Sequence, residues 1–193
     1  MVDTGVDLTH PDLAGQLVTG TDLVEPGTDP LDENGHGTHV AGIAVAATNN
    51  GIGIAGASPA AKVMPIRVLD GQGAGDPTTI AEGIDWAVAN GARVINLSLG
   101  GTGLSARLLK GGQINGAIRR AYAAGAVVVA AAGNDGAALR SYRFGVPVIV
   151  VNAVDSSGTV AEFSNYGDYP RCVRPWRRHL VNEPDFSQHA FRR

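Results

Sequence analysis

Apolar segments alternate with amphipathic segments along most of the chain. Strands are expected where branched apolar residues dominate, and helices where apolar residues recur every three to four positions. The expected strands cover residues 62–69, 93–99, 126–131 and 146–151, with the end of a further strand at residues 2–3. The expected helices cover residues 39–47, 77–90 and 114–124. Because strands that alternate with helices form parallel sheets, this order predicts an α/β fold with a mostly parallel sheet and helices on both of its faces.

The apolar positions of these strands also predict the core. The residues expected in it include Val63, Ile66, Val68, Val94, Ile95, Leu97 and residues 127–129. Continuous apolar strands of this kind are typical of parallel sheets. Ligand sites in such sheets lie at the carboxyl ends of the strands, and Asp3, Ser98 and Asn134 each follow such an end.

The composition changes abruptly near Pro170. Residues 1–169 carry nine basic and sixteen acidic side chains, a net charge of −7, whereas residues 170–193 carry six arginines and two acids, a net charge of +4. The second segment shows neither strand alternation nor helical periodicity. The sequence therefore predicts one domain over residues 1–169, followed by an arginine-rich tail without regular structure over residues 170–193.

Charge and hydropathy argue against two classes of partner. The whole chain of 193 residues has a net charge of −3, which gives no basic surface for nucleic acid. No apolar run approaches the ~20 residues that span a bilayer, so we expect no membrane partner. The first motif begins directly after Met1, so we expect no signal peptide in this chain. The single cysteine, Cys172, excludes an internal disulfide.

Two short motifs predict an acid–base pair. Asp3 ends the first expected strand in an Asp-Thr-Gly turn, and His36 precedes an expected helix within Asn-Gly-His-Gly. Acyl transfer needs a base for a weak nucleophile, an anion that orients the base, and donors for the oxyanion; Asn134 is a candidate donor. The helix dipole opposes a charged His36, while Asp3 favours it. We expect the carboxylate to dominate, because the dipole is equivalent to about half a charge.

Other interpretations of these motifs are weaker. Asp-Thr-Gly is also the signature of aspartic proteases, which need two such carboxylates, and this chain has one. His36 and His39 lack the His-Glu-x-x-His pattern of a helical metal site. Residues 51–56 match the Gly-x-Gly-x-x-Gly pattern of dinucleotide binding, but they follow a helix instead of a strand. A nucleotide-binding α/β protein is therefore an alternative at the level of the fold only.

Five segments taken together resemble the subtilisin-like serine proteases, or subtilases. They are VDTGVDLTHPDL (residues 2–13), NGHGTHVAGI (34–43), VINLSLGG (94–101), VVVAAAGNDG (127–136) and NAVDSSGTVAEFSNYG (152–167). Their order and spacing are also similar to those of the family, over roughly residues 1–169. The resemblance implies an incomplete subtilisin-like fold and a serine-type endopeptidase, a hydrolase that cleaves peptide bonds.

The resemblance also implies roles for individual residues. Asp3 would orient the base, His36 would be the general base, and Asn134 would donate its side-chain amide to the oxyanion. An extended polypeptide substrate would add as a strand to residues 98–100, and residues 131–133 would form part of the wall of a side-chain pocket. The residues implied for this binding are Ser98, Leu99, Gly100, Ala131, Ala132 and Gly133.

A structural calcium ion (Ca2+) is a further implication of the resemblance. Family members bind it through oxygen ligands on a loop that interrupts the histidine helix. The residues that match this ligand set are Asp12, Thr48, Asn50, Ile52 and Ile54. Together they would supply a carboxylate, a side-chain amide oxygen and backbone carbonyls, which suits calcium. An ordinary Asn-Gly turn at Asn50 explains the same loop sequence equally well.

The chain departs from the family pattern in its last part. The family's Gly-Thr-Ser-Met-Ala segment, which carries the nucleophile, does not occur in the 193 residues. We therefore expect a fragment that is inactive alone, with one apolar face of its sheet exposed. The codons of residues 171–179 also allow Asp-Val-Cys-Ala-Pro-Gly-Val-Asp-Ile in the next reading frame, so out-of-frame translation is one explanation of the tail.

Three functions are consistent with the sequence. The first is a fragment of a calcium-stabilised protease, whose secretion is implied by the resemblance alone. The second is a non-catalytic pseudoenzyme that binds extended peptides, which peptide affinity without turnover would favour. The third is one half of a split protease, which activity restored by a serine-bearing fragment would favour.

Overall fold

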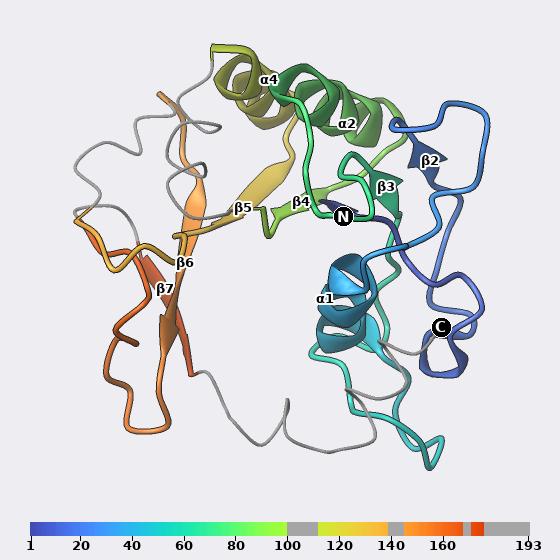
Figure 1. Ribbon diagram of the computed structural model, residues 1–193, viewed down its shortest axis with the longest axis horizontal. Coiled ribbons are helices and arrows are strands. Elements are labelled where there is room, and N and C mark those ends of the chain that lie inside the picture. The colour runs from blue at the N-terminus through green and yellow to red at the C-terminus, as the bar shows by residue number, and fades with distance from the viewer. Residues whose placement is uncertain (100–111, 139–144, 168–170, 176–193) are drawn as a thin grey trace. The chain divides into compact units, whose positions relative to one another are not determined.

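The computed structural model describes residues 1–99, 112–138, 145–167 and 171–175, with the backbone alone for the last of these segments. The described residues form two compact units, residues 1–79 and residues 80–175. Both units consist of parallel strands with helices beside them (Figure 1). The predicted α/β class is therefore confirmed, and the described strands form two sheets, one in each unit.

The first unit contains a three-stranded sheet and one long helix. Its elements are β1 (Val2–Asp3), the 3-10 helix η1 (Pro11–Leu13), β2 (Thr21–Asp22), α1 (His36–Val45) and β3 (Ile66–Arg67). β3 is the central strand, and Ile66 lies opposite both Val2 and Thr21 in parallel register. An ion pair of 2.9 Å between buried Arg67 and Asp22 ties β3 to β2.

An apolar core lies between α1 and segments on both sides of it in the chain. It contains buried side chains from the β1 region, from η1, from α1 and from the segment before β3, namely Met1, Val6, Leu13, Ala41, Val45 and Val63. At about 25 cal/mol per Å² of apolar surface, burying one such side chain contributes roughly 1.5–3 kcal/mol. This packing fixes α1 against the turn that follows β1, and so brings the first two motifs of the sequence into one place.

The second unit contains a four-stranded parallel sheet and two helices. Its elements are α2 (Pro77–Ala89), whose first residues belong to the first unit, β4 (Val94–Leu97), α4 (Gly112–Ala123), β5 (Val127–Ala131), β6 (Ile149–Val154) and β7 (Arg171–Pro175). The strands follow one another across the sheet in chain order. The Arg120 guanidinium of α4 makes two hydrogen bonds, of 2.9 and 2.6 Å, to the Asp85 carboxylate of α2.

The helices agree with the sequence more closely than the strands do. α2 begins at Pro77, and the Asp76 carboxylate before it accepts the Thr78 N–H at 2.7 Å. The helix ends one residue before the predicted position, and Gly91, which follows its end, has a φ of 83°. The predicted helix at 114–124 is α4, displaced by one or two residues. Helix α1 begins three residues before the predicted start at residue 39, for a reason given below.

Two predicted strands have the wrong bounds, and each begins only after a proline. The strand expected over residues 62–69 is reduced to Ile66–Arg67, and the one expected over 146–151 is displaced to Ile149–Val154. Pro65 and Pro147 each lack the N–H that a ladder requires. The short strand β2 and the helix η1 were not predicted.

The expectation of no regular structure in the tail was wrong at its start. β7 pairs in parallel with β6, and Val151 lies opposite Cys172. A ladder is held by backbone hydrogen bonds, so a strand at the end of a sheet does not need an alternating sequence. Residues 176–193 of the predicted tail lie outside the described residues.

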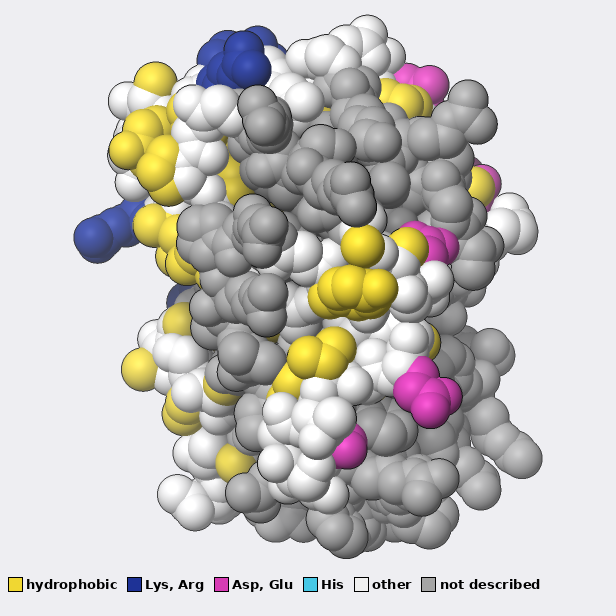
Figure 2. Space-filling model, turned by 90° about the vertical axis from the view of Figure 1, so that its left-hand side faces the viewer, with side chains coloured by type: hydrophobic (Ala, Val, Ile, Leu, Met, Phe, Trp, Pro, Cys, Tyr) yellow, Lys and Arg dark blue, Asp and Glu magenta, His cyan; other side chains and the backbone are white. Residues whose placement is uncertain are grey.

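In the sheet of the second unit, β4, β5 and β6 have buried side chains on one face, whereas those on the other face are half-buried or, at the start of each strand, exposed. Ile95, Leu97 and Val128 are buried as predicted, but Val94 is 60% exposed and Val127 is 46% exposed. These two predicted core residues face each other across β4 and β5, because side chains alternate between the faces of a strand. Hydrophobic side chains lie exposed in several groups on the side where β6 and β7 lie in Figure 1, which faces the viewer in Figure 2.

No helix among the described residues is long and apolar enough to cross a membrane.

This alternation gives a first prediction. Ile95→Thr should lower the free energy of unfolding by about 2–4 kcal/mol, because it removes buried apolar volume and buries a hydroxyl. Its neighbour provides the matched control, since Val94→Thr changes an exposed side chain and should stay within about 0.5 kcal/mol. Urea unfolding measures both, and equal losses in the two variants would contradict the described orientation of β4.

Candidate active site

Asp3 is the last residue of β1 and is held in a buried position. Its side chain is 1% exposed, and its Oδ1 accepts a hydrogen bond of 2.8 Å from the N–H of Thr4. Its Oδ2 has no hydrogen-bond partner among the described residues. A buried carboxylate needs charged or hydrogen-bonding partners to offset its loss of hydration. The groups around Asp3 must therefore include such partners.

The partner of Asp3 is His36, the first residue of α1. The ring Nδ1 lies 2.6 Å from Asp3 Oδ1, as the sequence predicts, although the two residues are 33 positions apart. The His36 side chain is 43% exposed, in contrast to Asp3. One ring nitrogen is thus oriented by a buried carboxylate, while the ring as a whole is accessible to a reactant.

Small residues allow this approach. The amino end of α1 lies so close to the turn after β1 that a Cβ at Gly37 would stand 2.0 Å from the Gly5 carbonyl oxygen. No other amino acid fits at residue 37 without moving the backbone of one of the two segments. Gly37 therefore sets the distance between the segments that carry Asp3 and His36.

The pKa of His36 is raised above its ordinary value. The largest cause is the hydrogen bond to Asp3; partial burial of the ring lowers the pKa, and the charges of Asp3 and Asp32 raise it further. The direction is the one expected from the Asp3 carboxylate, while the opposing effect of the helix dipole stays a prediction. The pKa of His39 is lowered, by burial and by the neighbouring His36.

Asp32 is a residue that sequence reasoning missed. Its carboxylate accepts hydrogen bonds from the backbone N–H groups of Asn34, Gly35 and Thr38, so it caps the first turn of α1. This cap explains why the helix begins at His36 and not at residue 39. The available signal was an aspartate followed by Asn-Gly shortly before an apolar helical segment.

Asn134 lies in the second unit, in the turn after β5, where it is exposed. The turn is held by buried Asn165, whose Oδ1 accepts the N–H groups of Asp135 and Ala137, both at 3.0 Å. The Nδ2 of Asn165 donates to the Ala132 carbonyl at 3.0 Å and to the Asp135 carboxylate at 3.1 Å. The turn is thus well defined, and the relation of Asn134 to the Asp3–His36 pair stays a prediction.

The residues predicted to bind substrate lie at the ends of two neighbouring strands. Ser98 and Leu99 follow β4, whereas Ala131 ends β5 and is followed by Ala132 and Gly133. Because β4 and β5 are parallel and Leu97 lies opposite Ala130, both segments leave the sheet at the same edge. Gly100, also predicted for this site, lies outside the described residues.

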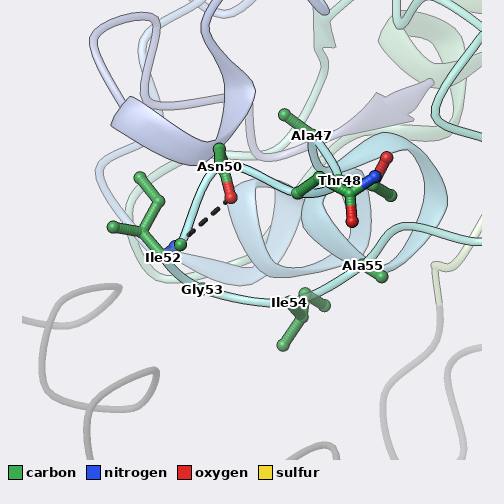
Figure 3. Close-up of a pocket in the computed structure, with 9 residues that line it drawn as sticks. Ala47, Thr48, Asn50, Ile52, Gly53, Ile54 and Ala55 are labelled. Carbon is green, nitrogen blue, oxygen red and sulfur yellow. Dashed lines mark hydrogen bonds between the residues drawn. The ribbon is translucent and has the colours of Figure 1, made fainter.

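Four of the five predicted calcium ligands, all except Asp12, lie in residues 47–55, which line a pocket of about 230 Å³ (Figure 3). Buried Asp12 contacts this loop from η1: its Oδ1 accepts from the Asn50 amide at 2.7 Å, and its Oδ2 accepts the Ile54 N–H at 3.0 Å. A Cβ at Gly53 would stand 2.0 Å from Asp12 Oδ2, so the glycine allows the carboxylate to reach the loop.

The donor chemistry of this loop fits a hard cation. The predicted set consists of oxygen donors only, with one carboxylate, and calcium takes six to eight such ligands. The same loop also has the internal bond of an Asx turn, from the Ile52 N–H to Asn50 Oδ1 at 3.3 Å (Figure 3). Among the described residues no group of three or more His, Cys, Asp or Glu side chains could hold a metal ion.

Comparisons with known proteins agree with this geometry. The profile described as "Subtilase family" matches residues 1–181. The chain is 46% identical over 176 residues to thermitase from Thermoactinomyces vulgaris, an alignment that covers 91% of this chain and 61% of thermitase. It is also 46% identical over 179 residues to the thermophilic serine proteinase of Bacillus sp. (strain AK1), covering 91% of this chain and 42% of the relative.

A solved structure has the same fold. The crystal structure of a cold adapted subtilisin-like serine proteinase matches with a TM-score of 0.75 and 30% sequence identity, over 90% of this chain and 60% of that one. The chain thus spans between 42% and 61% of the length of these relatives.

The contact between Asp3 and His36 gives a second prediction. Asp3→Asn should lower the pKa of His36, because it removes the main group that favours the charged ring. The pKa is measured from the ring proton shifts of His36 in NMR spectra over a range of pH. Asp7→Asn is the matched control, since the Asp7 carboxylate bonds to Thr9; an equal pKa shift in both variants would contradict the contact.

The same contact has a defined effect on stability. The folded-state pKa of His36 lies above its ordinary value of 6.5, so the contact stabilises the folded state fully below pH 6.5. That contribution is lost as the pH rises through the raised pKa. The stability advantage of the unmodified chain over Asp3→Asn should therefore shrink as the pH is raised through this range.

Proposed function

The chain belongs to the subtilase family, and from that premise we propose that it forms part of a serine endopeptidase that cleaves extended polypeptides. The observation that carries the proposal is the contact of 2.6 Å between His36 Nδ1 and Asp3 Oδ1. A buried carboxylate, an accessible imidazole and a raised imidazole pKa are the properties that a general base of acyl transfer requires.

The proposed chemistry assigns a proton to each step. With Nδ1–H donated to Asp3, the second ring nitrogen of His36 accepts the proton of a serine hydroxyl while the serine oxygen bonds to the substrate carbonyl carbon. The imidazolium that forms is stabilised by Asp3. It then returns the proton to the leaving amine nitrogen as the carbon–nitrogen bond breaks, and water repeats the cycle on the acyl-enzyme.

Asn134 is the proposed donor for the oxyanion. A side-chain amide at this place is worth on the order of 10²–10³ in turnover, a magnitude that comes from a member of this same family. Its support is the rigid turn that buried Asn165 holds after β5.

The proposed substrate binds as an added strand. β4 is an outer strand of the four-stranded sheet, and Ser98 and Leu99 continue from its end. An extended peptide can pair with such a segment through backbone hydrogen bonds, while Ala131, Ala132 and Gly133 form the wall of a side-chain pocket. Gly100 completes the proposed binding segment.

The source of the serine is part of the proposal. The family's Gly-Thr-Ser-Met-Ala segment does not occur in residues 1–193, so we infer that these residues need a serine from further sequence or from a second polypeptide. We also propose that the whole protein is secreted, in keeping with its family. Binding of peptides without turnover is the alternative function that the same observation favours.

An activity assay gives the third prediction. The polypeptide of residues 1–193 should neither cleave casein nor react with a fluorophosphonate probe, because both require the activated serine. Addition of a polypeptide that carries the serine segment should restore both signals, and His36→Gln should abolish them again. The exposed Asp29→Asn variant is the matched control and should retain the restored activity.

Two results would contradict this proposal. Cleavage by residues 1–193 alone that the fluorophosphonate blocks would show that the serine lies within them. Tight binding of extended peptides, without turnover after the serine segment is added, would favour the non-catalytic function.

We further propose that the loop of residues 48–54 binds a structural calcium ion. Asp12 and Asn50 would hold it with side-chain oxygens, and Thr48, Ile52 and Ile54 with backbone carbonyls. The ion would supply no chemistry to the reaction and would crosslink η1 to the end of α1. Support comes from the buried Asp12 carboxylate, which already contacts two residues of the loop.

Calcium binding is tested by thermal unfolding, which gives the fourth prediction. Calcium should raise the unfolding temperature, since a ligand at 100 times its dissociation constant stabilises by about 2.7 kcal/mol. Asp12→Asn should abolish the increase, while Asp29→Asn should retain it. An equal increase in both variants, or none in the unmodified chain, would leave the Asn-Gly turn as the role of this loop.

A further inference from the structure

We propose that Asp32 is a positioning residue that holds the acid and the base of the site in their mutual orientation. This inference rests on the proposed function, because it concerns the same pair, Asp3 and His36. Among the described contacts, Asp32 makes no hydrogen bond to the His36 ring, so we do not propose it as a catalytic residue. Its partners are groups of residues beside the pair: the Thr4 hydroxyl, next to Asp3, and groups of residues 34, 35 and 38, on either side of His36.

The Asp32 carboxylate accepts five hydrogen bonds from two segments of chain. Oδ1 accepts from the Thr4 hydroxyl at 2.8 Å, the Asn34 N–H at 3.0 Å and the Gly35 N–H at 2.8 Å. Oδ2 accepts from the Thr38 N–H at 2.8 Å and the Thr38 hydroxyl at 2.6 Å. Five donors around one carboxylate are more than a helix cap alone requires.

The two oxygens connect the two halves of the catalytic pair. Thr4 directly follows Asp3, and its hydroxyl also accepts the N–H of Gly37 at 2.9 Å. Thr38 and Gly37 belong to the first turn of α1, which begins with His36. Through Asp32 and Thr4, the residue after the acid is therefore bonded to the helical turn that carries the base.

The charge of Asp32 adds to this connection. The residue that precedes α1, Gly35, has no side chain to cap the helix, so Asp32 supplies both the acceptor and the negative charge at its amino end. The helix end would otherwise oppose a positive ring. The charged and titratable groups that act on the pKa of His36 are Asp3 and Asp32, which raise it, while His39 lies one turn along the same helix and has its own pKa lowered by His36.

Two variants of the 193-residue chain separate the effect of the Asp32 charge from the effect of the hydrogen bonds that join Asp32, Thr4 and Gly37. Asp32→Asn retains the shape of the side chain and removes its charge. Thr4→Val retains every charge and removes the hydroxyl that links Asp32 to Gly37. Asp29→Asn, three residues away in the same loop and exposed, is the matched control for the loss of one carboxylate.

The readout is the NMR titration of His36 together with the low-field resonance of its Nδ1–H. Asp32→Asn should lower the pKa of His36 by more than Asp29→Asn does. Thr4→Val should leave that pKa closer to the unmodified value but should weaken or abolish the low-field resonance. In the serine-complemented protein, both variants should lower kcat with little change in KM, since the defect lies in the orientation of the base.

The outcomes distinguish this inference from the proposed function. If the unmodified chain shows the low-field resonance and Asp32→Asn changes the pKa of His36 no more than the control does, Asp32 is only a helix cap and the inference is wrong. Retention of the resonance in Thr4→Val would equally overturn it. If Asp3→Asn does not lower the pKa of His36, the Asp3–His36 contact itself is absent, and the proposed function falls together with the inference.

Discussion

The close approach of two backbone segments is the constraint on which the first unit depends. The turn after β1 and the first turn of α1 must come near enough for Asp3 and His36 to meet at 2.6 Å, and a Cβ at Gly37 would prevent it. Packing of α1 onto Leu13, Val6 and Val63 provides the force that holds the segments together. The polar groups between them then decide the orientation. The geometry of the Asp3–His36 pair is thus a consequence of apolar packing from one side and of hydrogen bonds to Asp32 from the other.

The sequence predicts features that depend on neighbouring residues, and it misses contacts between segments that are far apart in the chain. Local residues mark both bounds of helix α2, with Asp76-Pro77 at its start and Gly91 after its end. The bounds predicted for this helix were therefore correct to one residue. Asp3 and His36 could be predicted because each stands in a motif with its own chemistry. Asp32 has no motif of its own: its role comes from Thr4, 28 positions earlier, and from Thr38, and only the fold brings these groups to one carboxylate.

Burial in the second unit shows a related limit. A continuous apolar strand indicates that a parallel sheet is present, but it does not tell which face is covered. Val94 and Ile95 are adjacent and equally apolar, yet one is 60% exposed and the other 1%. The difference depends on which elements lie above each face, and that information is not in the strand. Proline, in contrast, is a local signal, and the late starts of β3 and β6, after Pro65 and Pro147, could have been predicted from the missing N–H.

The loop of residues 48–54 shows why one sequence can support two interpretations. Asp12 is buried, so its carboxylate must be compensated, and in the structure the Asn50 amide and the Ile54 N–H do this. A cation would compensate the same charge more strongly than these two donors do, because it carries a full positive charge. The Asn50 oxygen and the loop carbonyls would then point towards the cation. The two arrangements use the same residues and the same glycine at position 53. The requirement for a compensated carboxylate is therefore common to the turn and to the proposed calcium site, and the difference in free energy between the two arrangements would set the affinity for calcium.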